Sequence, residues 1–149
     1  MEKQGLITFD EELQHTKAYL AVVKARYEEL IFVDYDTPVT NFKLPPLTLE
    51  PLVENAVKHG LDPDAGPMYI IIKTRRENSY NVITVENTGL DFHYDDNDNF
   101  ASSGINDEPH VGIKNVKSRL ETSCGGSLRV TKRPDGGTVA TIRIPTDHR

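Results

Sequence analysis

The chain has 149 residues, and a chain of this size is expected to fold as one domain around a single core. Its formal net charge of -6 argues against a broad nucleic-acid-binding surface, which would need a basic stripe. Apolar strings such as residues 68–72 are far shorter than the ~20 residues of a membrane span, and no signal-peptide pattern opens the chain, so we expect a soluble domain.

The first predicted element is a helix that begins at Thr8. Thr8 and Glu11 have the spacing of a capping box, in which the hydroxyl bonds the amide three residues later and the glutamate reaches back. Apolar residues then recur at helical spacing at positions 13, 20, 23, 27 and 30. The same spacing directs several polar residues to water, namely Glu12, Lys17, Lys24 and Glu28.

A strand, a loop and a second helix follow. Residues 31–36 alternate and are rich in β-formers, whereas the prolines between residues 38 and 46 mark a loop. Residues 48–59 are predicted to be helical, because Thr48 can cap the start of the helix and Gly60 can close its end.

The remaining elements are two hairpins separated by a loop and a third helix. Strands are expected at residues 68–75, 80–85, 128–132 and 138–144, and the helix at residues 111–120. The acidic stretch 90–109 has little periodicity and is expected to be a loop. This order favours an α+β fold, a two-layer sandwich in which helices cover one face of a mixed, mostly antiparallel sheet.

The second helix has an apolar and a polar side. At ~100° per residue, residues 49, 52, 53 and 56 gather on one side, and Glu54, Asn55 and Lys58 on the other. An amide oxygen beside a cation can hold a hydrated Mg²⁺ and the phosphates that the metal neutralises. Taken alone, the same pattern also describes a solvated face with an ordinary Glu–Lys pair.

The whole string Leu44-Pro-Pro-Leu-Thr-Leu-Glu-Pro-Leu-Val-Glu-Asn-Ala-Val-Lys-His-Gly60 resembles the N box of LytS-type sensor histidine kinases. These kinases share the Bergerat (GHKL) ATP-binding fold with gyrase, Hsp90 and MutL. The resemblance implies that ATP and Mg²⁺ bind here, with Asn55 as the Mg²⁺ ligand and Lys58 on phosphate. It also implies that His59 faces the nucleotide edge, and that Glu54 is catalytic, through a metal-bound water or as a base.

The string Val85-Glu-Asn-Thr-Gly-Leu-Asp91 stands where these kinases carry an Asp-x-Gly-x-Gly loop that binds adenine. By this resemblance Asn87 replaces the aspartate that accepts the adenine amino group, Gly89 is the first glycine, and Asp91 replaces the second. A neutral carbonyl accepts more weakly than a carboxylate, so Asn87→Asp is expected to preserve or strengthen nucleotide binding. Without the resemblance, Asn-Thr-Gly after a strand is an ordinary turn.

Two further strings resemble boxes of the same family. His110-Val-Gly-Ile-Lys-Asn115 keeps one glycine of a pair that precedes the third helix, where backbone amides approach phosphate. The resemblance implies ATP contacts from Gly112 and Asn115, with Lys114 a weaker candidate, and a lid at about residues 90–110. Gly136-Gly-Thr138 resembles the terminal Gly-Thr strand, which adds Thr138 to the ATP-binding residues.

The resemblance reaches nearly the whole chain. Residues 10–27 look like the segment that joins the dimerisation helices to the catalytic domain, so we expect a helical connector at residues 1–30 and an ATP-binding catalytic domain at residues 31–149. The implied function is that of a two-component sensor histidine kinase, whose catalytic domain transfers the ATP γ-phosphate to a histidine in an upstream segment. The Asn-Pro-His-Phe-type motif of that histidine does not occur in this sequence, so this chain alone is not expected to phosphorylate itself.

The implied partners are ATP, the upstream dimerisation and phosphoacceptor region, and a response regulator, with no nucleic acid. The full-length protein is expected to be a homodimer anchored in the inner membrane, with this domain in the cytoplasm. Two alternatives stay open. Asn87, Asp91 and His110 depart from the family pattern and leave room for an adenine-nucleotide sensor without catalysis, and another GHKL ATPase, such as an anti-sigma kinase, is the second alternative.

Overall fold

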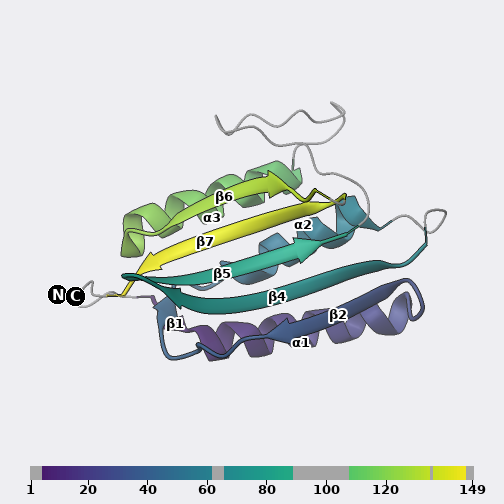
Figure 1. Cartoon of the computed structure of the whole chain (residues 1–149), viewed down its shortest axis with the longest axis horizontal. Helices are drawn as coiled ribbons and strands as arrows, with labels where there is room; N and C mark the ends of the chain where they lie inside the picture. Colours follow the sequence, from purple (N-terminus) through teal and green to yellow (C-terminus); the bar gives the residue numbers. More distant parts are fainter. Residues whose placement is uncertain (1–4, 62–65, 89–107, 135, 147–149) are drawn as a thin grey trace.

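The fold is a sheet covered on one face by helices. The computed structural model describes residues 5–61, 66–88, 108–134 and 136–146. Its main sheet has the strand order β2-β4-β5-β7-β6, with β2 (Ile31–Asp36) parallel to β4 (Met68–Glu77). The other neighbours pair antiparallel through β5 (Tyr80–Asn87), β7 (Thr138–Pro145) and β6 (Ser127–Lys132). The helices α1 (Phe9–Arg26), α2 (Leu49–Gly60) and α3 (Glu108–Cys124) lie together on one side of this sheet (Figure 1). The predicted α+β two-layer sandwich is confirmed.

The core fills the space between the sheet and the helices. Along β7 buried and half-buried residues alternate, as expected for a strand with one face on the core, and the buried ones are Thr138, Ala140, Ile142 and Ile144. Against this face each helix turns apolar side chains of its own, including Leu20 of α1, Val53 of α2 and Leu120 of α3. The inner face of the sheet is therefore where helix and strand residues meet.

The start of α1 follows the prediction from the capping pattern. Thr8 accepts a hydrogen bond from the backbone N–H of Glu11 at 3.1 Å, and the helix runs to Arg26. A feature that the sequence did not predict precedes it, because β1 (Ile7–Thr8) pairs antiparallel with β3 (Lys43–Leu44) in a small second sheet. Strands of two residues are too short to show a period.

The N-terminus of α2 is capped by a residue of α1. The predictions that Thr48 caps this helix and that Glu12 faces water are both wrong. The Thr48 hydroxyl donates to the carbonyl of Pro45 at 2.5 Å and makes no cap bond. Glu12 is instead 2% exposed, and its carboxylate accepts from the backbone N–H groups of Leu47 at 3.2 Å and of Thr48 and Leu49 at 2.9 Å each. A buried carboxylate is stable there because the first amides of a helix lack intrahelical partners and carry a positive dipole end.

Two helix ends also differ from the predictions. Gly60 is the last residue of α2 and does not close it, since Leu61 is the cap residue and donates to Val57. The third helix begins at Glu108, which makes Gly112 its fifth residue and not its start. In the part of the chain that the structure describes, no helix has the length and apolar character needed to cross a bilayer.

Candidate nucleotide-binding site

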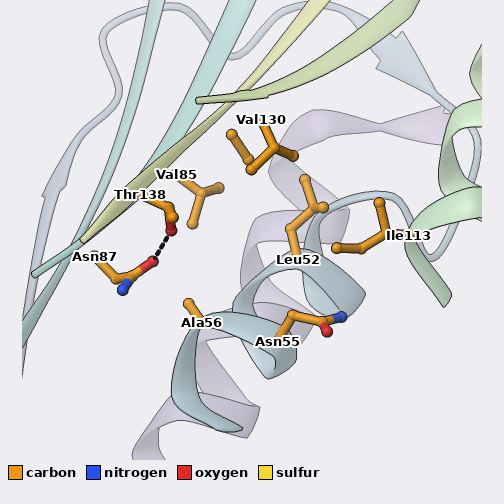
Figure 2. A pocket seen from close by; sticks show the side chains of 9 residues that line it. Leu52, Asn55, Ala56, Val85, Asn87, Ile113, Val130 and Thr138 are labelled. Atoms are coloured by element: carbon orange, nitrogen blue, oxygen red, sulfur yellow. Dashed lines mark hydrogen bonds between the residues drawn. The ribbon is translucent and has the colours of Figure 1, made fainter. Parts of the chain in front are cut away.

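A pocket lies between α2 and the inner face of the sheet, where α3 begins to pack over it (Figure 2). Its lining is apolar except for two asparagines and one threonine. The residues are Leu52, Asn55, Ala56, Val85, Asn87, Ile113, Val130, Thr138 and Ala140. A mostly apolar concavity with a few convergent polar groups is the usual form of a small-molecule site.

The strand register builds the sheet side of this pocket. Asn87 of β5 pairs with Thr138 of β7, and two residues earlier Val85 pairs with Ala140. Residues two apart on a strand share a face, so all four side chains point to the helices. Ala140 also pairs with Val130 on β6, which brings the edge strand into the lining. The polar pair therefore stands at one end of an apolar floor.

Asn87 uses both ends of its carboxamide. Its Oδ1 accepts from the Thr138 hydroxyl at 2.5 Å, and its Nδ2 donates to the backbone carbonyl of Thr88 at 3.0 Å. The bond to Thr88 fixes which end of the amide is the donor, so the oxygen faces Thr138. An amide oxygen has two lone pairs. Because Thr138 takes one of them, the second can accept a hydrogen bond from an amino group of a ligand.

Two glycines hold the backbone around Asn87. A Cβ on Gly60 of α2 would stand 2.8 Å from Asn87 Nδ2 and 2.9 Å from Met68 Cε. Gly137 has a φ of +95°, and a Cβ there would overlap the carbonyl oxygen of Asn87. The end of α2 and the start of β7 thus approach Asn87 from both sides, and the approach of Gly137 to the backbone of Asn87 requires glycine.

Asn55 lies across the pocket from this pair, on α2 and near Ile113 of α3 (Figure 2). Its side chain is 7% exposed, and Nδ2 donates to the carbonyl of Pro51 at 2.9 Å. Its Oδ1 is buried and has no hydrogen-bond partner among the described residues. A buried acceptor left unpaired is costly, so it is a place where a ligand group is expected. Burial also contradicts the alternative that Asn55 belongs to a solvated helix face.

The donor set fits Mg²⁺ bound together with phosphate. Among the described residues no cluster of three or more His, Cys, Asp or Glu side chains could hold a metal by itself. Mg²⁺ is usually bound through few protein oxygens, and phosphate oxygens and water complete its octahedron. The unpaired Oδ1 of Asn55 is a hard oxygen atom that could serve as one such ligand.

The other predicted site residues are not all gathered in the pocket. Glu54 is half-buried, and its negative charge affects Tyr19 on α1. Burial is the first cause that raises the pKa of Tyr19, and the charges of Glu54 and Glu50 are the next. Lys58, Lys114 and Asn115 are exposed, and within the described ranges none of these three lines the pocket. Gly89, most of the predicted lid and the side chain of His59 lie outside the described residues, and Gly112 is described only as part of α3.

Sequence reasoning missed the apolar lining of the site. Leu52 and Ala56 were assigned to the core side of α2, which is correct, yet this same side faces the pocket. Val85 could have been found, because it lies two residues before Asn87 on the same strand face. Val130 and Ala140 could not, since their place depends on the pairing of β6, β7 and β5.

Solved structures of similar shape are catalytic domains of histidine kinases. The catalytic domain of histidine kinase ThkA superimposes with a TM-score of 0.73 over 98% of this chain and 99% of that chain, at 17% identity. The mycobacterial sensor histidine kinase MprB gives 0.67 over 94% of this chain and 95% of that chain, at 14% identity. At such identities the likeness shows the fold, which is the Bergerat fold of histidine kinase ATP-binding domains.

The family follows from the sequence comparison. Residues 46–148, more than half of the chain, match the model of the histidine kinase-, DNA gyrase B- and HSP90-like ATPases. The chain belongs to this family. It is 33% identical over 143 residues to YwpD of Bacillus subtilis and 32% identical over 142 residues to the sensor histidine kinase BtsS of Escherichia coli. The matches cover 94% and 93% of this chain but only 50% and 24% of those two proteins. The sensor protein LytS of Staphylococcus saprophyticus is 28% identical, and this match covers 96% of this chain and 25% of LytS. The domain is therefore an ATP-binding catalytic domain of the sensor histidine kinase type.

Proposed function

We propose that the pocket binds Mg·ATP with adenine at Asn87 and Thr138 and the metal on Asn55. The observation that carries this proposal is that the unpaired Oδ1 of Asn55 shares one pocket with an Asn–Thr pair that keeps a free acceptor lone pair. The apolar residues between them, such as Leu52 and Val85, suit the faces of a purine. Bound Mg²⁺ would neutralise charge on the phosphates during transfer.

The exposed residues would act on the phosphate side. Lys58 lies one helical turn beyond Asn55 on α2, a spacing that supports a phosphate contact. Lys114 and Asn115 are exposed at the N-terminal part of α3, and with Gly112 they are proposed to approach the phosphates from that helix. Gly89, His59 and the lid at about residues 90–110 complete the proposed site, and Glu54 is proposed as the catalytic carboxylate.

The reaction proposed is transfer of the γ-phosphate to a histidine from a segment other than this chain. The phosphoryl group would then pass from that phosphohistidine to a response regulator. The whole kinase is proposed to be a homodimer anchored in the inner membrane, with this domain in the cytoplasm. The identity with sensor kinases supports this assignment. His15 is exposed on α1 but lacks the surrounding phosphoacceptor motif, so the chain alone is proposed not to label itself.

The test of the binding site is a calorimetric titration with a non-hydrolysable ATP analogue, with and without Mg²⁺. We expect Mg²⁺ to tighten binding to the wild type and to have no such effect on Asn55→Ala. Asn41→Ala, at an exposed asparagine outside the pocket lining, is the matched control and should behave as wild type. A folded Asn55→Ala protein that keeps the full Mg²⁺ enhancement would remove Asn55 from the metal site.

A second experiment separates the kinase from a nucleotide sensor without catalysis. The chain is incubated with γ-labelled ATP, alone and with the dimerisation and phosphoacceptor helices of its own full-length protein supplied in trans. We expect acid-labile label only in the mixture, and only on the added helices. Binding without transfer in the mixture would favour the sensor, and label on this chain, lost in His15→Gln, would contradict the proposed source of the histidine.

A further inference from the structure

Glu12 connects α1 to the helix that carries the proposed metal ligand. Its Oε2 accepts from the backbone N–H groups of Thr48 and Leu49 at 2.9 Å each and of Glu50 at 3.4 Å, while Oε1 accepts from Leu47 at 3.2 Å. One carboxylate thus satisfies the amides that open α2. Because it belongs to another helix, these bonds also fix where the first turn of α2 stands relative to α1.

The helix has no local substitute for this carboxylate. Thr48 is the residue at the capping position, but its hydroxyl is turned to Pro45 and forms no cap bond. Glu12 is fully enclosed, at 2% exposure, and a buried carboxylate persists only where donors surround it. An apolar residue would pack in this position without that requirement. The arrangement therefore makes the start of α2 depend on the seating of α1.

A short path of contacts leads from this cap to the site. Pro51 lies in the first turn of α2, two residues after Leu49, and its carbonyl accepts from Nδ2 of Asn55 at 2.9 Å. That bond sets the rotation of the Asn55 carboxamide, and so the direction of its unpaired Oδ1. From Leu49 to Asn55 the path spans six residues, or about 9 Å of helix.

The same loop is held from α3. Arg119 donates through its guanidinium to the carbonyl of Leu47, the residue whose N–H bonds Glu12. Leu47 has a φ of +60°, a left-handed conformation that is unfavourable for leucine and persists only when neighbours impose it. Side chains from α1 and α3 therefore both bond Leu47, two residues before α2 begins.

We propose that Glu12 is a positioning residue, which sets the orientation of Asn55 and makes Mg·ATP affinity depend on how α1 is seated. This inference rests on the proposed role of Asn55 as metal ligand. It adds that the nucleotide site is responsive to α1, which contributes no residue to the pocket lining. A displacement of α1 along α2 would withdraw the cap and release the first turn that orients Asn55.

The first measurement needs no nucleotide. In ¹H–¹⁵N spectra of the free protein, the side-chain NH₂ signals of Asn55 are assigned by their loss in Asn55→Ala. We expect Glu12→Gln to shift these signals, because a neutral amide places an NH₂ group against the N–H groups of α2. Glu11→Gln, at the neighbouring exposed carboxylate of α1, should leave them in place.

The second measurement is affinity for Mg·ATP. We expect Glu12→Gln to weaken binding about tenfold, the equivalent of about 1.4 kcal/mol. Glu12→Asp keeps the charge on a shorter side chain and should fall between Glu12→Gln and wild type, which keeps the test valid if the glutamine variant folds poorly. Leu20→Ala removes a buried leucine of α1 two turns away and serves as a variant of lowered stability with the cap intact.

The outcomes separate the two proposals. Equal loss of affinity in Leu20→Ala and Glu12→Gln would attribute the effect to stability and overturn the positioning role. Unchanged Asn55 signals and unchanged affinity in a folded Glu12→Gln protein would also overturn it. If the Asn55 signals respond to Glu12 but Mg²⁺ enhancement survives in Asn55→Ala, then the proposed metal ligand is wrong while the coupling between the helices stands.

Discussion

Replacing Asn55 with leucine should make the nucleotide-free protein more stable while it abolishes Mg²⁺-dependent binding. Asn55 is buried on α2, and its Oδ1 has no hydrogen-bond partner within the described part of the chain. Leucine has a similar length, suits the neighbouring Leu52 and Ile113, and removes the unpaired oxygen. An asparagine that lowers stability at this position is expected if ligand binding requires its side chain.

The magnitude follows from two opposing hydrogen-bond terms. A buried polar group without a partner costs about 1–3 kcal/mol, and the substitution removes that cost. The hydrogen bond from Nδ2 of Asn55 to the Pro51 carbonyl is lost, which lowers the free energy of unfolding by about 0.5–1.5 kcal/mol. Leucine is also a slightly better helix former than asparagine. The free energy of unfolding should rise by about 1 kcal/mol, or about 3 °C in midpoint for a domain of this size.

Thermal unfolding with and without Mg²⁺ and an ATP analogue measures both effects. The wild type should gain stability from the ligand by mass action, and the Asn55→Leu protein should gain none. The order of the two midpoints should therefore reverse: leucine is higher without ligand, and asparagine is higher with saturating ligand. A leucine variant that is less stable without ligand would refute the cost assigned to the unpaired oxygen, and one that keeps the ligand response would refute its use in metal binding.

Three further predictions concern Asn87 and Gly137 at the pocket and Glu50 on α2. Asn87→Asp replaces the donor that bonds Thr88 by an oxygen, so we expect the free energy of unfolding in urea to fall by about 1–3 kcal/mol, and undiminished stability would contradict this expectation. For nucleotide affinity, the sequence alone predicts that the same change preserves or strengthens binding. Gly137→Ala and Gly66→Ala introduce the same left-handed strain, at φ +95° and +97°, but only the Cβ at position 137 overlaps a backbone atom. Gly137→Ala should therefore lose clearly more stability and nucleotide affinity than Gly66→Ala. Equal effects of the two variants would exclude the close approach of Gly137 to Asn87. Burial and then neighbouring carboxylates raise the pKa of Glu50, so the contribution of this group to stability is present below its ordinary pKa of 4.5 and is lost as the pH rises through the raised pKa. Glu50→Gln should therefore have a larger free energy of unfolding than wild type at neutral pH, and the difference should shrink in acid. A difference that stays constant with pH would argue against the raised pKa.

The order of the long elements and the two ends of the site could be predicted from sequence, because they rest on local patterns. Helical spacing placed Asn55 on α2, and the string after β5 singled out Asn87, and both line one pocket. Thr138 lines the same pocket and donates a hydrogen bond to Asn87, while its contact with ATP stays a prediction.

The errors at Glu12 and Thr48 have a common physical cause. A helical wheel separates polar from apolar positions but does not know which neighbour covers each one. Glu12 lies beside Leu13 at the border of the apolar stripe, and α2 happens to present its free amides there. Such a carboxylate is predictable only once the packing of two helices is known.

The strand register explains why the remaining pocket residues could not be predicted from the sequence. Val130 and Ala140 reach the pocket only because β6, β7 and β5 pair as they do, and a shift by one residue would turn their side chains to the other face. The paired strands β1 and β3 were invisible for a different reason, since two residues give no period to detect.

The pocket lining has a consequence for how this domain evolves and how it is engineered. Most of its apolar residues, among them Leu52, Val85, Ile113 and Val130, also belong to the core that holds helices and sheet together. A bound purine ring would thus take the place of a missing core side chain, one that arrives and departs with each reaction cycle. Mutations that fill this space would produce a sturdier domain that no longer admits its ligand. Selection for thermal stability alone should therefore favour substitutions at these positions first, and those substitutions would abolish ligand binding.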